Sequence, residues 1–241
     1  MTDPEVEEPH RRETVRPSES WIPVPRTARY WTLEEEGEAR ELWIVLHGYK
    51  QLARRFLRRF TPIHDGTRRI VAPEGLSRFY LDQAPGRHGP NSVVGATWMT
   101  REDRLHEIRD YVGYLDRLLD EVAPSVGEAP LTVLGFSQGV ATAARWVVQG
   151  RPRPVRVVAW GDTLPPDLDM EAAAHALDGV ELVLVRGSRD RAVEGPRVEE
   201  ERSALRGAGI AYREVRYEGG HDIHPQPLRE LAAAVPGRLS S

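Results

Sequence analysis

A serine with a glycine two positions before it and another two positions after it is the feature of the sequence with the clearest chemistry. Residues 135–139 read Gly-Phe-Ser-Gln-Gly, with the apolar run 131–134 before them and the helical pattern 140–149 after them. A serine on a tight strand-to-helix turn needs small residues two positions to either side, because the backbone is strained there. The pattern therefore predicts a nucleophile elbow that presents the hydroxyl of Ser137 at the top of a sheet.

A serine is a weak nucleophile by itself, so the elbow needs a base and an acid that orients the base. Asp190 follows the apolar run 180–185, and His221 follows the run 211–217. Both runs are predicted strands, so both side chains are expected at the sheet edge that also presents Ser137. His221 would take the proton of Ser137 as the serine attacks an acyl carbonyl, while Asp190 holds the imidazole in the useful tautomer.

The order along the chain is serine, acid, histidine, as in the α/β-hydrolase fold and unlike the two familiar serine-protease folds. Asp162 is a rival acid because it also follows a predicted strand, 155–160, and His224 is a rival base close to His221. Strand order and turn context favour Asp190 over Asp162. A histidine beside proline at the start of a helix is more often a cap or a surface residue, which favours His221 as the base.

Acyl transfer also needs hydrogen-bond donors for the oxyanion of the tetrahedral intermediate. One predicted donor is the backbone amide of Gln138, the residue after the nucleophile. The other lies after Leu46-His47-Gly48, where a predicted strand ends, and we assign it to the backbone amide of Tyr49. Gly48 allows a close approach to the substrate, and His47 is interpreted as a hydrogen-bonding residue beneath the turn.

Short apolar runs alternate with amphipathic runs along the rest of the chain. Predicted strands cover residues 28–33, 41–46, 69–72, 131–134, 155–160, 180–185 and 211–217. Predicted helices cover residues 51–60, 104–122, 140–149, 194–206 and 225–234. This alternation predicts an α/β fold with a mostly parallel central sheet, helices on both faces, and ligands at the carboxyl ends of the strands. The long excursion 74–100 is predicted as a functional loop.

Four motifs together resemble the phospholipase/carboxylesterase family of the α/β-hydrolases, the group that includes the acyl-protein thioesterases. They are Leu46-His47-Gly48, Gly135-Phe136-Ser137-Gln138-Gly139, Gly187-Ser188-Arg189-Asp190 and Gly219-Gly220-His221-Asp222-Ile223. The resemblance covers roughly residues 40–235, and the serine-glutamine-glycine elbow is its most specific element. It implies a compact esterase on the α/β-hydrolase fold with no large cap domain.

The same resemblance bears on the substrate pocket. It implies that Leu164, in a pocket-lining segment, and Trp98 contact the acyl or alcohol group of a substrate, although Trp98 suits a core position equally well. Two positions depart from the family pattern. Val140 stands where a second glycine usually follows the elbow, and Lys50 stands where a small residue usually follows the oxyanion amide. Both departures concern substrate fit more than catalysis.

The composition argues against several other classes. With 33 basic and 37 acidic residues, the formal net charge is −4, so bulk electrostatics favour neither a nucleic-acid partner nor a membrane surface. There is no cysteine, which excludes disulfides, thiolate metal sites and a cysteine nucleophile. His64, His88 and His106 have no spacing typical of metal ligands, so we expect no metal and no other cofactor.

Residues 1–20 are rich in glutamate, arginine and proline, which predicts a mobile tail before a single domain that spans residues 21–241. No signal-peptide pattern and no membrane-spanning window occurs, so a cytoplasmic protein without stable membrane insertion is expected. Four arginines of the predicted helix 51–60 are interpreted as a solvated face, with an anion-binding patch as the alternative. They are Arg54, Arg55, Arg58 and Arg59.

These features predict a serine esterase that cleaves small-molecule acyl esters of short to medium chain length through an acyl-enzyme on Ser137. The same triad would serve a thioesterase or a lysophospholipase, because the triad does not encode the leaving group. A non-catalytic binding protein on the same fold is the alternative from another class. A third hypothesis is an interaction protein that works through residues 1–20. A monomer and a homodimer both agree with the sequence.

Overall fold

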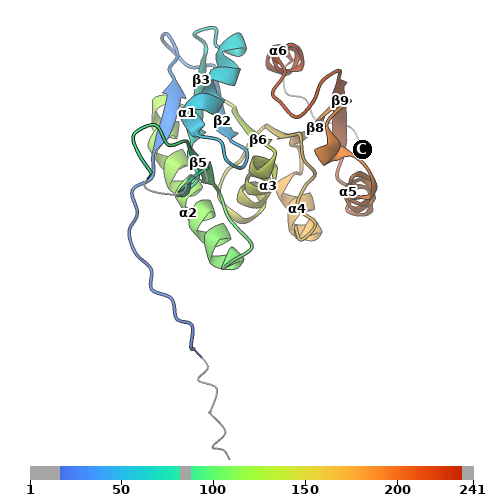
Figure 1. The fold of residues 1–241 in the computed structure, drawn as a ribbon. Helices are drawn as coiled ribbons and strands as arrows, with labels where there is room; N and C mark the ends of the chain where they lie inside the picture. Colours follow the sequence, from blue (N-terminus) through green and yellow to red (C-terminus); the bar gives the residue numbers. More distant parts are fainter. Residues whose placement is uncertain (1–16, 82–87, 235–241) are drawn as a thin grey trace, which may run out of the picture.

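A seven-stranded sheet forms the centre of the protein, whose computed structural model describes residues 17–81 and 88–234. The strands lie in the order β1 (Tyr30–Leu33), β3 (Arg68–Pro73), β2 (Glu41–Leu46), β6 (Leu131–Phe136), β7 (Arg156–Trp160), β8 (Glu181–Gly187) and β9 (Tyr212–Tyr217). Of these seven, β1 alone is antiparallel to its neighbour. The predicted mostly parallel sheet is therefore confirmed (Figure 1).

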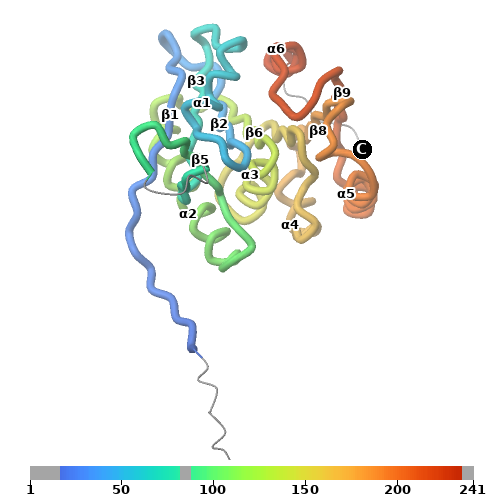
Figure 2. Tube along the Cα trace, in the orientation of Figure 1, coloured from blue at the N-terminus to red at the C-terminus, as the bar shows by residue number. Residues whose placement is uncertain are grey.

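Helices cover both faces of this sheet (Figures 1 and 2). One face carries α1 (Ala53–Leu57), its 3-10 continuation η1 (Arg58–Ile63) and α6 (Pro225–Ala233). The other carries α2 (Arg104–Val122), α3 (Gln138–Gln149), α4 (Met170–Ala176) and α5 (Pro196–Gly207). Two short 3-10 turns, η2 (Ala123–Ser125) and η3 (Arg191–Val193), are the other helical elements of the described residues. Each face has its own hydrophobic core.

The residue pattern explains why these elements form. Along β2, Leu42 and Ile44 enter one core while Trp43 and Val45 enter the other, because successive side chains of a strand point to opposite faces. In α2 the buried residues recur at steps of three and four, which places them on one stripe of the helix. They are Ile108, Tyr111, Leu115, Leu118 and Val122.

The structure differs from the sequence-based expectation in three places. The excursion 74–100, predicted as a loop, contains an antiparallel hairpin of β4 (Ser77–Tyr80) and β5 (Val94–Thr97). Helix α4 was not predicted, and the predicted helix 51–60 changes to 3-10 geometry at Arg58. Pro62 lies inside that 3-10 segment and has no amide hydrogen for an α-helical bond.

The predicted tail lies mostly outside the described residues, which begin at residue 17. Residues 17–29 contain no helix or strand and are almost all exposed. Trp21 fastens this segment to the start of α2, since its Nε1 donates to Asp103 Oδ1 at 3.2 Å and its ring stacks on His106. Within residues 17–81 and 88–234, no helix combines the length and the apolarity needed to span a membrane.

Candidate active site

Ser137 occupies a strained turn between β6 and α3, as the elbow pattern predicts. Its φ is 53° and its ψ is −122°, a conformation that residues with a side chain rarely adopt. A Cβ on Gly135 would lie 2.2 Å from the carbonyl oxygen of Gly139, and a Cβ on Gly139 would lie 2.2 Å from that of Leu46. Both glycines are therefore required by close backbone contacts.

His221 and Asp190 meet at the carboxyl ends of the neighbouring parallel strands β9 and β8. Nδ1 of His221 lies 2.8 Å from Oδ2 of Asp190, whose carboxyl is 1% exposed and also accepts from the amide of Ala192 at 3.0 Å. A carboxylate only accepts, so Nδ1 carries the hydrogen and Nε2 is left free to accept a proton. This is the tautomer that a general base needs.

The loops that carry these residues converge on one another. The ring of Phe136, which precedes Ser137, lies 4.9 Å from the ring of His221. A Cβ on Gly161 would lie 3.3 Å from Oδ2 of Asp190 and 3.4 Å from Cε1 of His221, so β7 ends beside the pair. In the described part of the chain no hydrogen bond joins Ser137 Oγ to His221, as is common before substrate binds.

The turn proposed for the oxyanion lies against Ser137. A Cβ on Gly48 would be 3.1 Å from Cβ of Ser137. The amide of Gln51 donates to the carbonyl of Gly48 at 3.2 Å, and Lys50 has a φ of 68°, the positive value that the third residue of a type II turn requires. Keeping a side chain in this left-handed conformation costs about 1 kcal/mol or more.

Both predicted oxyanion donors are backbone amides for which the described residues supply no acceptor. Within the described ranges, neither the amide of Tyr49 nor that of Gln138 donates a hydrogen bond. The Gln138 side chain is committed elsewhere, because its Oε1 accepts from the amide of Trp98 and its Nε2 donates to the carbonyl of Met99. Only the backbone of Gln138 is therefore left to contact a substrate.

His47 lies beneath this turn and is fully buried. Its Nε2 accepts from the amide of Gly75 at 3.0 Å, so its Nδ1, 2.8 Å from the carbonyl of Gly48, must donate. The ring is therefore neutral, and burial lowers the pKa of His47. Its own carbonyl accepts from Trp98 Nε1 at 2.8 Å. The sequence-based interpretation of His47 as a structural residue agrees with these contacts.

This buried histidine makes stability depend on pH. Its ordinary pKa is 6.5, and its pKa in the folded protein is lower, so below about pH 6.5 the unfolded chain binds more protons than the folded one. We expect the melting temperature to fall as the pH is lowered from 7.5 to about 5.5. In thermal melts, His47→Gln, which can keep both hydrogen bonds, should show a shallower fall of the melting temperature with pH. Substitution of the exposed His175 should leave this slope as it is in the wild type. Equal slopes for all three proteins would contradict this prediction.

The two residues predicted to contact the substrate, Trp98 and Leu164, both pack in the core. Trp98 is 2% exposed and packs between His47 and Tyr111, which is the core position that the sequence left open. Leu164 is 8% exposed, and its amide donates to Oε1 of Glu201 at 2.8 Å. Neither side chain presents an open surface to a ligand, because both are committed to packing in the same core.

The rival acid and base have other partners. Asp162 accepts from the amide of Thr163 at 2.8 Å and pairs with Arg197 at 3.2 Å, and burial raises its pKa. His224 caps α6, since its side chain accepts from the amide of Gln226, and its ring stacks on Tyr217. Asp190 is thus the carboxyl that contacts His221.

Sequence reasoning missed Tyr217, the last residue of β9. Its hydroxyl lies 2.8 Å from the carbonyl of Gly220 and 2.7 Å from that of Asp222, the residues on either side of His221. Trp160 Nε1 also donates to the carbonyl of Asp222, at 3.0 Å. These contacts hold the loop that carries His221, residues 218–224, which we call the histidine loop. No spacing in the sequence could reveal them, because they depend on how this loop folds back over its own strand.

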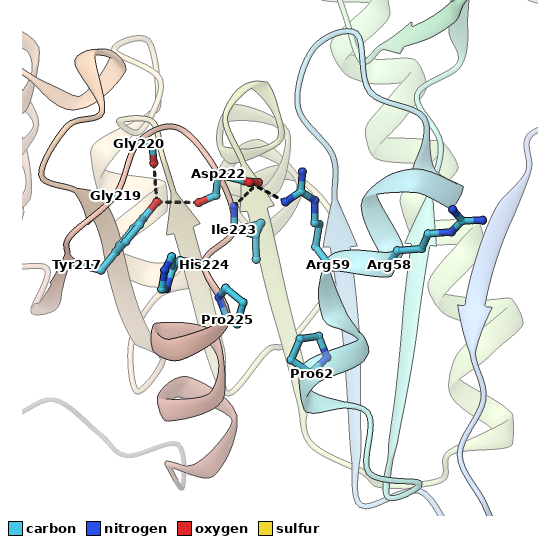
Figure 3. Close-up of a pocket in the computed structure, with 10 residues that line it drawn as sticks. All are labelled: Arg58, Arg59, Pro62, Tyr217, Gly219, Gly220, Asp222, Ile223, His224 and Pro225. Atoms are coloured by element: carbon cyan, nitrogen blue, oxygen red, sulfur yellow. Dashed lines mark hydrogen bonds and ion pairs between the residues drawn. The ribbon is translucent and has the colours of Figure 1, made fainter.

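A hollow of about 260 Å³ lies between η1 and the histidine loop (Figure 3). The ion pair of Arg59 with Asp222, at 2.6 Å, spans it, while Arg58 points away. Arg54 lies over the ring of Trp31, 5.1 Å from its centroid. Two of the four clustered arginines, Arg54 and Arg59, therefore have partners within the protein. Because these two are not free to bind an anion, the solvated-face interpretation of the cluster is favoured over the anion-binding one.

Comparisons with known proteins extend these observations. No protein-family model and no curated protein matches the chain. Among solved structures, acyl-protein thioesterase 2 of Zea mays matches with a TM-score of 0.63 at 18% identity over 86% of this chain and 96% of that one. The chain has the α/β-hydrolase fold. The predicted fold class is confirmed.

Two further solved structures have the same fold. Esterase PE8 matches with a TM-score of 0.63 at 23% identity, over 86% of this chain and 96% of its own. A variant of SOBER1 from Arabidopsis thaliana matches with a TM-score of 0.57 at 16% identity, over 81% and 97%. At these identities the likeness concerns the fold, and the chemistry must be argued from the residues of this chain.

Among the described residues, no group of three His, Asp or Glu side chains is arranged to hold a metal ion.

Proposed function

We propose that the protein is a serine hydrolase, a carboxylesterase that cleaves acyl esters of short to medium chain length through an acyl-enzyme on Ser137. The observation that carries this proposal is the 2.8 Å contact between His221 Nδ1 and Asp190 Oδ2, at the sheet edge where Ser137 stands in its strained turn. The pair leaves Nε2 of His221 as the proton acceptor.

The proposed reaction has two halves. His221 Nε2 takes the proton of Ser137 Oγ as that oxygen attacks the acyl carbonyl carbon, and the amides of Tyr49 and Gln138 donate to the resulting oxyanion. The intermediate collapses, the alcohol leaves with the proton from His221, and the acyl group stays on Ser137. A water molecule then gives its proton to His221, attacks the acyl-enzyme, and releases the carboxylic acid as Ser137 regains its proton.

Covalent labelling tests this proposal directly. A fluorophosphonate should modify the folded protein once, and peptide mass spectrometry should place the adduct on Ser137. Ser137→Ala should lose both the label and the hydrolysis of 4-nitrophenyl butyrate, while Ser188→Ala, an exposed serine before Asp190, should keep both. Folded wild-type protein that neither labels nor hydrolyses would refute the proposal in favour of a non-catalytic binding protein.

The ester preference needs a separate measurement. A panel of matched esters and thioesters with acyl chains of two to twelve carbons, about the span from short to medium, compares kcat/KM for the two leaving atoms. Higher values for the esters support the carboxylesterase. A strong preference for thioesters would replace it with a thioesterase that uses the same triad.

A further inference from the structure

Lys50 combines backbone strain with a position beside the nucleophile. Among the described residues other than glycine, Lys50, Asp103 and Ser137 alone have a positive φ. Two of these three belong to the candidate active site. Strain of this kind concentrates at functional sites, where it persists because the surrounding structure enforces it. A glycine at residue 50 would relieve this strain, so the presence of a lysine there suggests that its side chain has a function.

The hairpin fixes the backbone of Lys50 firmly. Its amide donates to the carbonyl of Ala96 at 2.9 Å, and the amide of Ala96 donates to the carbonyl of Gln51 at 3.2 Å. A Cβ on Gly95 would lie 2.6 Å from the carbonyl oxygen of Lys50, so the two segments are in direct contact. The turn 48–51 therefore cannot shift without moving β5, and Lys50 is held at a constant place.

That place is within reach of the reacting centre. A Cβ on Gly48 would lie 3.1 Å from Cβ of Ser137, and Lys50 is two residues further along. Each residue adds at most about 3.8 Å between Cα atoms, so the Cα atom of Lys50 lies within about 12 Å of Cβ of Ser137. Its side chain is exposed and long enough to meet a substituent on a bound ester.

Lysine is an unusual residue type in this chain. Lys50 is the single lysine among the 33 basic residues. Its Nζ lies 5.3 Å from the centroid of the Tyr49 ring, which stacks on Phe79 at 5.5 Å. Within residues 17–81 and 88–234, no carboxylate forms an ion pair with it. The ammonium group thus lies over an aromatic ring and is available to form an ion pair with an anionic group of a ligand.

We propose that the ammonium group of Lys50 binds an anionic substituent, such as a carboxylate, on the acyl ester that Ser137 attacks. The aromatic surface of Tyr49 and Phe79 would take the apolar part of the same substrate. This inference rests on the proposed esterase function and names its substrate class. It also gives a reason for a side chain at a position where the turn favours glycine.

Two pairs of esters test the proposal, each pair differing in one charge. The first pair is 4-acetoxybenzoate and methyl 4-acetoxybenzoate, in which the leaving alcohol carries the charge. The second is the 4-nitrophenyl monoester of adipic acid and 4-nitrophenyl hexanoate, in which the acyl group carries it. For each pair the readout is the ratio of kcat/KM for the anionic ester to kcat/KM for the neutral one.

We expect Lys50→Gln to lower this ratio by about two- to fivefold in at least one pair, the range that an exposed charge pair gives, while Lys50→Arg retains most of it. Half-molar salt should lower the wild-type ratio toward that of Lys50→Gln, because ions screen exposed charges. Arg54→Gln removes a nearby cation that lies over Trp31 and should leave the ratio unchanged. Thermal melts check that each variant is folded.

The outcomes separate this inference from the function on which it rests. Unchanged ratios in both pairs for Lys50→Gln would overturn the role of Lys50, while hydrolysis of the neutral esters would still support the esterase. A ratio that falls equally for Arg54→Gln would mean that general surface charge, and not Lys50, attracts the anion. Absence of hydrolysis of every ester, with no label on Ser137, would instead overturn the proposed function.

Discussion

Asp190→Asn should lower kcat by about four orders of magnitude. The amide keeps the shape of the side chain and can still accept from the amide of Ala192, which now bonds to Oδ1 at 3.0 Å. It presents an NH₂ group to His221 Nδ1, however, so Nδ1 must become the acceptor and the hydrogen moves to Nε2. In that tautomer Nε2 cannot take the proton of Ser137, while the pocket and the KM should change little.

Asp162→Asn is the matched control for this prediction. Asp162 also follows a strand of the same sheet, but its partners are Thr163 and Arg197. We expect a loss of kcat below about tenfold, since no step of the proposed mechanism uses this carboxyl. Steady-state kinetics on one ester, with fluorophosphonate labelling as a second readout, compares the two variants. A larger loss for Asp162→Asn would assign the catalytic acid to Asp162 instead.

Gly139→Ala should destabilise the fold by roughly 3 kcal/mol, at the upper end of the usual effect of overpacking. The new Cβ would lie 2.2 Å from the carbonyl oxygen of Leu46 and 2.9 Å from that of His47. Both are backbone atoms, so α3 or the end of β2 must move. Movement there separates Ser137 from the turn of Tyr49, and labelling of the serine should slow with the loss of stability.

Gly113→Ala makes the same substitution where nothing opposes it. Gly113 is exposed within α2, and beyond its chain neighbours and the backbone of its own helix no atom lies within 4 Å of the Cβ position. Alanine should therefore stabilise the protein by about 0.5–1 kcal/mol, because it favours the helix. Urea unfolding of both variants gives the two changes on one scale. Similar free energies of unfolding for both would refute the close-packing argument for the elbow.

Local patterns were sufficient to predict much of the fold. The strands β2, β6, β7 and β8 lie where continuous apolar runs predicted them, because a strand buried on both faces has no polar alternation. The predicted helix 104–122 coincides with α2, whose apolar residues repeat at helical spacing. Helix α4 was missed because its residues Met170–Ala176 include four alanines, which mark no clear apolar face.

The hairpin in the excursion 74–100 shows where local patterns fail. The strands β4 and β5 have four residues each and are separated by a long connection, so neither shows the pattern of a strand or a tight turn. Their pairing is a contact between distant parts of the chain. The same is true of Trp98, whose Nε1 finds the carbonyl of His47, a residue 51 positions away.

The sequence alone predicted the candidate chemistry of this protein: an elbow serine, an acid and a histidine in a given order, each placed after a predicted strand. Residue type and spacing suffice for that, because parallel strands bring their carboxyl ends to one edge. Only the tertiary structure decided which acid contacts His221, that Trp98 and Leu164 pack in the core, and that Tyr217 holds the histidine loop. Those outcomes depend on side-chain distances between separate loops, which the order of residues along a chain does not specify.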